Sequence, residues 1–165
     1  MCGRFTFQPT ETFYERFEIS NRLASLMPRY NIAPSQMVPV IIANSSRQIV
    51  LMRWGLIPHW AKDEKIAYNM INARVETLTQ LPAFRDLLSH NRCLVPATGY
   101  YEWKGEGRDK APYYIHPQDE QFSAFAGLYD VWITPTGEAL YTFTIITTEA
   151  DHGESSKPDA SHACE

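Results

Sequence analysis

The chain has 165 residues and a net charge of −4, with 44% hydrophobic and 21% charged residues. This length and composition are typical of one globular domain with a buried core and exclude a disordered chain. No apolar run is long enough to cross a membrane, and the N-terminus lacks a secretory signal pattern. Residues 1–148 carry 14 acids and 14 bases, so a polyanion would need a local basic cluster rather than an overall positive field.

The cysteines are odd in number and far apart, at Cys2, Cys93 and Cys164. Their spacing argues against a disulfide framework and a zinc knuckle, and it favours a reducing compartment. The five histidines show no metal-ligand spacing. We therefore expect no metal site and no cofactor.

The first third of the chain predicts a strand, a short helix, a loop and a hairpin. The apolar residues Phe13, Tyr14 and Phe17 would form one helix face. Pro39 suggests that the strand containing it lies at a sheet edge. The expected elements are a strand at Arg4–Phe7, a helix at Thr10–Ile19, an extended loop at Met27–Ser35, and hairpin strands at Met37–Ala43 and Gln48–Trp54.

The rest of the chain predicts a loop, one helix and four further β segments. Residues 66–77 show no clear periodicity, and Pro82 could open a helix because proline is tolerated in the first turn. The expected elements are a loop at Gly55–Lys65, a helix at Pro82–His90, strands at Arg92–Ala97, Tyr113–His116, Phe122–Trp132 and Ala139–Thr148, an extended segment at Thr98–Lys104, and a turn at Thr134–Glu138. Together these indicate a β-rich α+β domain over residues 1–148, followed by a polar, acidic and disordered tail over 149–165.

A cysteine directly after the initiator methionine is the first candidate for chemistry. Removal of Met1 would leave Cys2 with an α-amine and a thiol on adjacent carbons. The amine can condense with an aldehyde, and the thiol can then close a five-membered thiazolidine near neutral pH. The alternative interpretation is that Cys2 is an idle terminal residue.

Two further segments carry candidate polar groups. Glu102 stands among Tyr100, Tyr101 and Trp103, whose rings would shield its carboxyl group from water and suit it to acid–base chemistry. Asn72 and Arg74 are two residues apart and would share one face of an extended segment, where they could orient a hydroxyl and hold a phosphate. For each, an ordinary surface or turn role is the alternative.

Aromatic and basic side chains could bind an unpaired strand of nucleic acid. Indole rings on loops and strand ends stack on bases, although tryptophan is more often a core residue. Trp60, in a loop with His59 and Lys62, is the best placed for such contact. The candidates are the indoles of Trp54, Trp60 and Trp103 and a possible phosphate track of Arg4, Arg29, Arg53, Arg74, Arg85 and Arg92, several of which would be ordinary solvated charges.

Four motifs occur together and in order along the chain. They are MCGRF at residues 1–5, RYNIAPSQ at 29–36, WGLIPHW at 54–60 with INARVET at 71–77, and GYYEWK at 99–104. With them the chain resembles the SOS-response-associated peptidase family of abasic-site processing proteins. The resemblance runs from Met1 to about Thr148 and implies a single domain around a distorted β-barrel.

The resemblance also implies a function and a set of roles. Met1 would be removed, with the chain's own peptidase-like activity as one route, and Cys2 would form a thiazolidine with the aldehyde of an abasic site in single-stranded DNA. The covalent DNA–protein crosslink, a product of DNA lyase-like chemistry, would shield the lesion. Asn72 would position Cys2 and the sugar, and Glu102 would act as acid–base group. The implied DNA contacts are Arg4 and Arg74 to phosphates, with Trp54, Trp60 and Trp103 near the bases.

The resemblance ends before the C-terminus. Such proteins carry a histidine–x–arginine–x–proline stretch after this point, and neither His152 nor His162 is followed by that arginine and proline. The C-terminus is therefore expected to be truncated or altered, with uncertain activity. We expect a monomer with no membrane partner, cytoplasmic and associated with the nucleoid in a bacterium, or nuclear in a eukaryote.

Two other functions remain open at this point. A non-catalytic module would hold single-stranded DNA by stacking and phosphate contacts without a covalent adduct. An amidohydrolase with an N-terminal cysteine nucleophile also begins Met-Cys-Gly, but it predicts an aliphatic run where Arg4 stands and a longer domain.

Overall fold

The segments rich in valine, isoleucine, tyrosine and phenylalanine form strands, as their side chains favour. The computed structural model describes residues 3–105, 111–118 and 122–148. The elements within them are β1 (Arg4–Phe7), α1 (Phe13–Arg16), β2 (Arg29–Ile32), β3 (Met37–Ala43), β4 (Arg47–Trp54), the 3-10 helix η1 (Glu64–Asn69), β5 (Asn72–Arg74), the 3-10 helix η2 (Val75–Thr77), α2 (Pro82–Arg85), α3 (Leu87–His90), β6 (Arg92–Ala97), β7 (Gly99–Lys104), β8 (Ala111–Ile115), β9 (Ser123–Ile133) and β10 (Ala139–Thr147).

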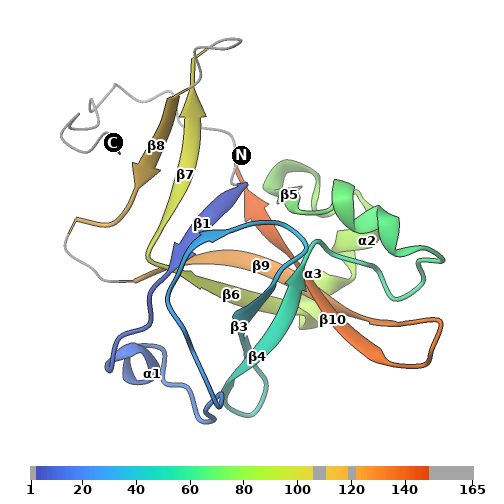
Figure 1. Ribbon diagram of the computed structural model, residues 1–165. Helices are drawn as coiled ribbons and strands as arrows, with labels where there is room; N and C mark the ends of the chain where they lie inside the picture. The colour runs from blue at the N-terminus through green and yellow to red at the C-terminus, as the bar shows by residue number, and fades with distance from the viewer. Residues whose placement is uncertain (1–2, 106–110, 119–121, 149–165) are drawn as a thin grey trace.

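Five strands close into a barrel in the order β4-β3-β6-β9-β10 (Figure 1). Neighbouring strands are antiparallel except at the closure, where β10 runs parallel to β4 with Phe143 opposite Trp54. Further along β10 the short strand β5 takes the place of β4, with Asn72 opposite Ile145. Closure removes the open edges of this ring of strands. The predicted β-rich α+β fold around a distorted barrel is confirmed.

A second sheet, in the order β2-β1-β7-β8, packs against the barrel through one of its faces. Phe5 and Tyr100 are directly opposite each other and therefore share that face. The Phe5 ring contacts Trp54 on β4 and Phe125 on β9, with ring centroids 5.2 Å and 5.9 Å apart. Strands β7 and β8 continue past the barrel as a projecting hairpin (Figure 1).

The base of this hairpin is held by a cluster of hydroxyl groups around Thr6. The Thr6 hydroxyl lies 2.8 Å from that of Tyr114 and 2.8 Å from that of Thr98. The Tyr114 ring crosses Gly99 so closely that a Cβ atom there would lie 2.4 Å from the tyrosine hydroxyl oxygen. Glycine at position 99 is therefore needed to place β8 against β7.

Several predicted elements are confirmed by the structure. The strands at Arg4–Phe7, Met37–Ala43 and Arg92–Ala97 occur with the predicted bounds. The predicted strands in the second half of the chain are each present within a residue or two. The turn at Thr134–Glu138 is closed by a hydrogen bond of 2.9 Å from the Gly137 N–H to the Thr134 carbonyl.

Other predictions about local structure are wrong. The helix predicted at Thr10–Ile19 is the single turn α1, and the chain leaves it with Glu18 at a φ of 52°. The loop predicted at Met27–Ser35 contains strand β2, because Ile32 pairs with Phe5 on β1. Such long-range pairing overrides the local signal of two prolines.

The remaining differences concern proline. The helix predicted at Pro82–His90 is divided into α2 and α3 at Asp86. Strand β3 pairs on both sides and is not an edge strand, although Pro39 lies outside the short ladder that Ile41 and Ile42 form with β6. The predicted acidic tail lies outside the described residues. Among the described residues, no helix is long and apolar enough to cross a membrane.

Candidate functional site

The candidate nucleophile Cys2 lies outside the described residues, but the strand that follows it is well defined. Arg4 begins β1 directly opposite Tyr101 on β7. Its guanidinium donates a hydrogen bond of 2.8 Å to the Asn31 side chain on β2. Strand β1 therefore begins in the second sheet beside β7, opposite the residue that precedes Glu102.

Glu102 lies on the face of β7 that turns toward the barrel. Side chains alternate along a strand, so Glu102 shares the face of Tyr100, which packs with Phe125 at a centroid distance of 5.7 Å. Tyr113 on β8 stands directly opposite Glu102. The glutamate is half-buried at the position where this face passes beyond the barrel core.

Asn72 and Arg74 lie on strand β5, so the prediction that both occupy one extended segment is confirmed. Asn72 is half-buried and Arg74 is exposed, with the buried Ala73 between them pointing to the opposite face. Strand β5 pairs in parallel with the end of β10, and this pairing fixes the positions of Asn72 and Arg74 relative to β10.

One aromatic contact connects the strands that carry these residues. Phe5 packs on Trp54, whose indole N–H donates a hydrogen bond of 2.8 Å to the carbonyl of Ile71. Ile71 directly precedes Asn72. Phe5 therefore connects the start of β1 directly to the strand of Glu102, by pairing with Tyr100, and indirectly, through Trp54, to the residue before the strand of Asn72.

The three predicted tryptophan contacts have different surroundings. Trp54 is completely buried and stacks on Phe143 at 6.4 Å, so the prediction that its ring contacts bases is wrong. Its place in the barrel interior makes it a support for the site instead. Trp60 is 53% exposed and Trp103 is 45% exposed, so both rings are accessible to a ligand.

Trp103 and Arg4 share one face of the second sheet, whereas Glu102 lies on the other. Arg4 is opposite Tyr101, and Trp103 is two residues further along β7, so the three side chains follow the same face. The structure thus brings Arg4 and Trp103 together and separates them from the carboxyl group. A nucleic-acid strand that contacts both the Arg4–Trp103 face and the Glu102 carboxyl group would have to pass around the end of β7.

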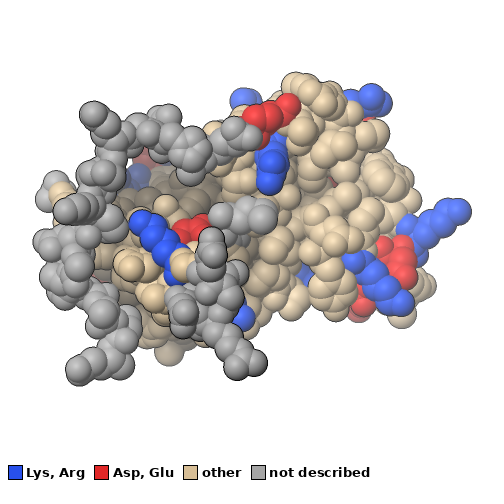
Figure 2. Space-filling model, turned by 90° about the horizontal axis from the view of Figure 1, so that it is seen from above, with Lys and Arg blue, Asp and Glu red and all other residues tan. Residues whose placement is uncertain are grey.

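The six predicted arginines do not form one track. Arg29 donates to the Met37 carbonyl and to the Gln36 side chain, so its role is structural. Arg53 forms an ion pair of 2.7 Å with Glu64. Figure 2 shows basic side chains on the upper face in small separate groups, some beside acidic ones, over the part of that face that is described.

The remaining described cysteine is unsuited to nucleophilic chemistry. Burial raises the pKa of the Cys93 thiol to about 12, so the thiol stays protonated at neutral pH. Among residues 3–105, 111–118 and 122–148, no three histidine, cysteine or acidic side chains are grouped as metal ligands would be.

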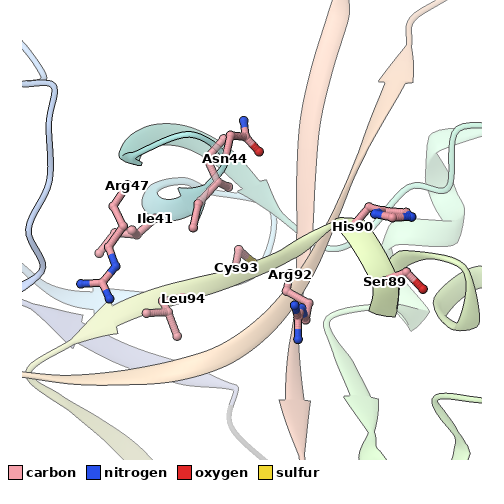
Figure 3. Close-up of a pocket in the computed structure, with 10 residues that line it drawn as sticks. Ile41, Asn44, Arg47, Ser89, His90, Arg92, Cys93 and Leu94 are labelled. Carbon is pink, nitrogen blue, oxygen red and sulfur yellow. The ribbon is translucent and has the colours of Figure 1, made fainter.

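Cys93 lines a hollow of about 540 Å³ that shares no residue with the candidate site. Figure 3 shows that the polar side chains around it diverge, with Asn44, Arg47, Arg92 and His90 pointing in different directions. Nothing in this arrangement converges on a common point. The hollow therefore lacks the geometry of an active site, despite its size.

Sequence analysis missed Tyr113 and Lys104 as neighbours of Glu102. Tyr113 is the cross-strand partner of Glu102, and the Lys104 ammonium group lies 5.4 Å from the centre of the Tyr113 ring. Alternation along β7 places Lys104 on the face of Glu102, and this could have been read from the sequence. The register of β8 could not, because it depends on how the hairpin closes.

Comparison with known proteins adds a family to this geometry. A sequence profile described as "SOS response associated peptidase (SRAP)" matches residues 1–156. The chain is 49% identical over 154 residues to the "Abasic site processing protein YoqW" of Bacillus subtilis, covering 90% of this chain and 69% of that protein. It is 35% identical to the "Abasic site processing protein HMCES" of Gallus gallus, covering 74% of this chain and 46% of that protein. A crystal structure of a protein from Bacteroides thetaiotaomicron superposes with a TM-score of 0.81 at 33% identity, covering 89% of this chain and 68% of its own.

Proposed function

The chain belongs to the SOS response associated peptidase family, and from this premise we propose that it captures abasic sites in single-stranded DNA. Cys2, exposed by removal of Met1, forms the covalent link to the aldehyde of the abasic sugar. The adduct shields the lesion. The chain acts as a monomer in this proposal.

The observation that carries this proposal is the place of β1. Its first residue, Arg4, lies opposite Tyr101, next to Glu102 in the chain, and its second residue, Phe5, is tied through Trp54 to the strand of Asn72. Successive Cα atoms are about 3.8 Å apart, so Cys2 is within two such links of Arg4. The start of β1 is thus connected to the strand that carries the carboxyl group of Glu102 and, through Trp54, to the strand that carries the amide group of Asn72.

The proposed reaction needs no oxidant and no cofactor. The sugar opens to its aldehyde with Glu102 as acid–base group, and the α-amine of Cys2 adds to the carbonyl carbon with loss of water to give an imine. The Cys2 sulfur then adds to the imine carbon, and the thiol proton passes to the nitrogen. Asn72 orients the sugar or the cysteine backbone during these steps.

The DNA strand is held by residues on both sides of β7 and on β5. Arg4 and Arg74 contact phosphates, and the exposed rings of Trp60 and Trp103 stack on bases next to the lesion. Removal of Met1 precedes capture, because an acylated nitrogen cannot form the imine. Hydrolysis of the Met1–Cys2 bond by the chain itself is the peptidase-like part of the proposal.

The test mixes the Met1-processed protein with a single-stranded oligonucleotide that carries one abasic site. A band that survives a denaturing gel is expected for the wild type and for Cys93→Ala, and no such band for Cys2→Ala. Cys2→Ser keeps the amine but cannot close the sulfur ring, so its link should appear only after reduction of the imine with borohydride. A wild-type protein that binds the oligonucleotide but gives no stable band would favour the non-catalytic binding module.

A further inference from the structure

The turn that carries Trp60 is closed by one hydrogen bond of its own and anchored to strand β9 of the barrel by two more. The Ala61 N–H donates a hydrogen bond of 2.8 Å to the Pro58 carbonyl, which closes the turn. The Trp132 indole donates 2.8 Å to the Ala61 carbonyl, and the His59 N–H donates 2.8 Å to the Asp130 carboxylate. The side chains at the tip of the turn are therefore presented on a preorganised backbone.

His59 at this tip is held in one orientation by a buried carboxylate. Its Nδ1 lies 3.0 Å from Asp130 Oδ2, and the second oxygen of Asp130 accepts a hydrogen bond of 2.8 Å from the Val131 N–H. A carboxylate only accepts, so Nδ1 carries the hydrogen and Nε2 faces away from Asp130. The side chain of Asp130 is 10% exposed, whereas that of His59 is 67% exposed.

One carboxylate faces the His59 ring, and the groups that bond around that carboxylate are uncharged. Among the described residues, Asp130 is the acidic group within ion-pair distance of the imidazole. The other groups that bond to Asp130 are the uncharged Val131 N–H and the hydroxyl of Thr142, which donates to the Asp130 carbonyl. A protonated ring would present an Nε2–H donor to solvent, directly beside the exposed indole of Trp60.

We propose that His59, held by Asp130, is a phosphate contact for single-stranded DNA that acts together with stacking on Trp60. This inference rests on the proposed function and extends the bound strand beyond the abasic nucleotide. A charged donor and an exposed ring on one rigid turn match the alternation of phosphate and base along an unpaired strand. The backbone N–H groups of His59 and Val131 already bond to the Asp130 carboxylate, so the imidazole is not required to fix the turn.

The experiment measures non-covalent binding to a labelled, undamaged single-stranded oligonucleotide by fluorescence anisotropy. The full chain carrying Cys2→Ala is used so that no adduct forms. Adding His59→Gln should weaken binding about 3–10-fold, because it removes the imidazole contact. His59→Lys should restore the affinity, because its ammonium group can bind the same phosphate.

Salt dependence and a matched control complete the test. Loss of one phosphate contact should reduce the slope of log affinity against log salt by about 0.7. His90→Gln removes another exposed histidine, at the end of α3 beside the hollow, and should leave affinity and slope unchanged. If His59→Gln binds like the parent, the inference is overturned while the proposed function stands. If the parent does not bind single-stranded DNA, both are overturned.

Discussion

The two most conspicuous regions of the molecule differ in what their side chains do. The hollow beside Cys93 is about 540 Å³, yet its polar side chains point apart (Figure 3). In the region of β1, β5 and β7, by contrast, Phe5 and Trp54 connect the strands that carry Asn72 and Glu102. The comparison indicates that convergence of elements, rather than the size of a depression, marks the candidate site of this fold.

The largest expected effect comes from removing the Phe5 ring, which packs on Trp54 and connects β1 to the barrel. Phe5 is 1% exposed, and Phe5→Ala should lower the free energy of unfolding by about 3–5 kcal/mol through lost burial and a cavity. Leu94→Ala, at a partly exposed residue of the hollow, should cost much less. Urea denaturation followed by tryptophan fluorescence measures both. Equal losses for the two variants would contradict the role given to Phe5.

Removing the carboxyl group should have the next largest effect, and on rate rather than stability. Glu102→Gln should slow adduct formation about 100-fold, as is typical when an acid–base group is lost. His90→Gln, which changes a titratable residue beside the hollow, should leave the rate unchanged. The rate is measured from single-turnover time courses on denaturing gels. An unchanged rate for Glu102→Gln would remove the glutamate from the mechanism.

A smaller effect is expected for the exposed ring. Trp60→Ala should weaken binding of single-stranded DNA by about 1–3 kcal/mol if the indole stacks on a base. Arg92→Gln removes a cation from the hollow and should leave the affinity the same, although it changes the net charge as a phosphate contact would. Anisotropy titrations at one fixed salt concentration compare the two. A larger loss for Arg92→Gln would make the hollow a binding site and reverse the comparison.

The smallest effect concerns the thiol in the hollow. Burial raises the pKa of Cys93 from 9.0 to about 12, so above pH 9 the unfolded chain loses a proton that the folded chain keeps. The stabilising contribution is therefore complete below pH 9 and declines as the pH rises toward 12, by at most about 1.4 kcal/mol per pH unit. The free energy of unfolding should fall less steeply between pH 9 and 10 in Cys93→Ala. Identical slopes would show that the thiol ionises in the folded state.

Sequence patterns predicted the strands well where hydrophobic runs are local, and poorly where pairing is long-range. Strand Met37–Ala43 has a continuous run of buried residues at its centre, 38–42, and was predicted with its observed bounds. The barrel was expected from the family resemblance alone; local patterns could not predict its closure, because this depends on Phe143 pairing with Trp54 from a distant part of the chain. Strand β2 was missed for the same reason.

The WGLIPHW motif shows why site residues are harder to predict than strands. Its first tryptophan, Trp54, is buried in the barrel, whereas its second, Trp60, is exposed on an anchored turn. The two have the same side chain and lie six residues apart, and the family resemblance placed both near the bases, although the loop context favoured Trp60 for contact. The path of the chain after β4 is what leaves Trp54 buried in the barrel and Trp60 exposed to a ligand.

The most direct test of the central claim is the identity of the linked residue. The adduct formed with an abasic oligonucleotide is digested with nuclease and protease, and the modified peptide is mapped by mass spectrometry. The account predicts an N-terminal peptide that begins at Cys2, lacks Met1, and carries the sugar remnant with loss of one water and resistance to borohydride. A remnant on a lysine or on Cys93, or a linked peptide that still carries Met1, would contradict it.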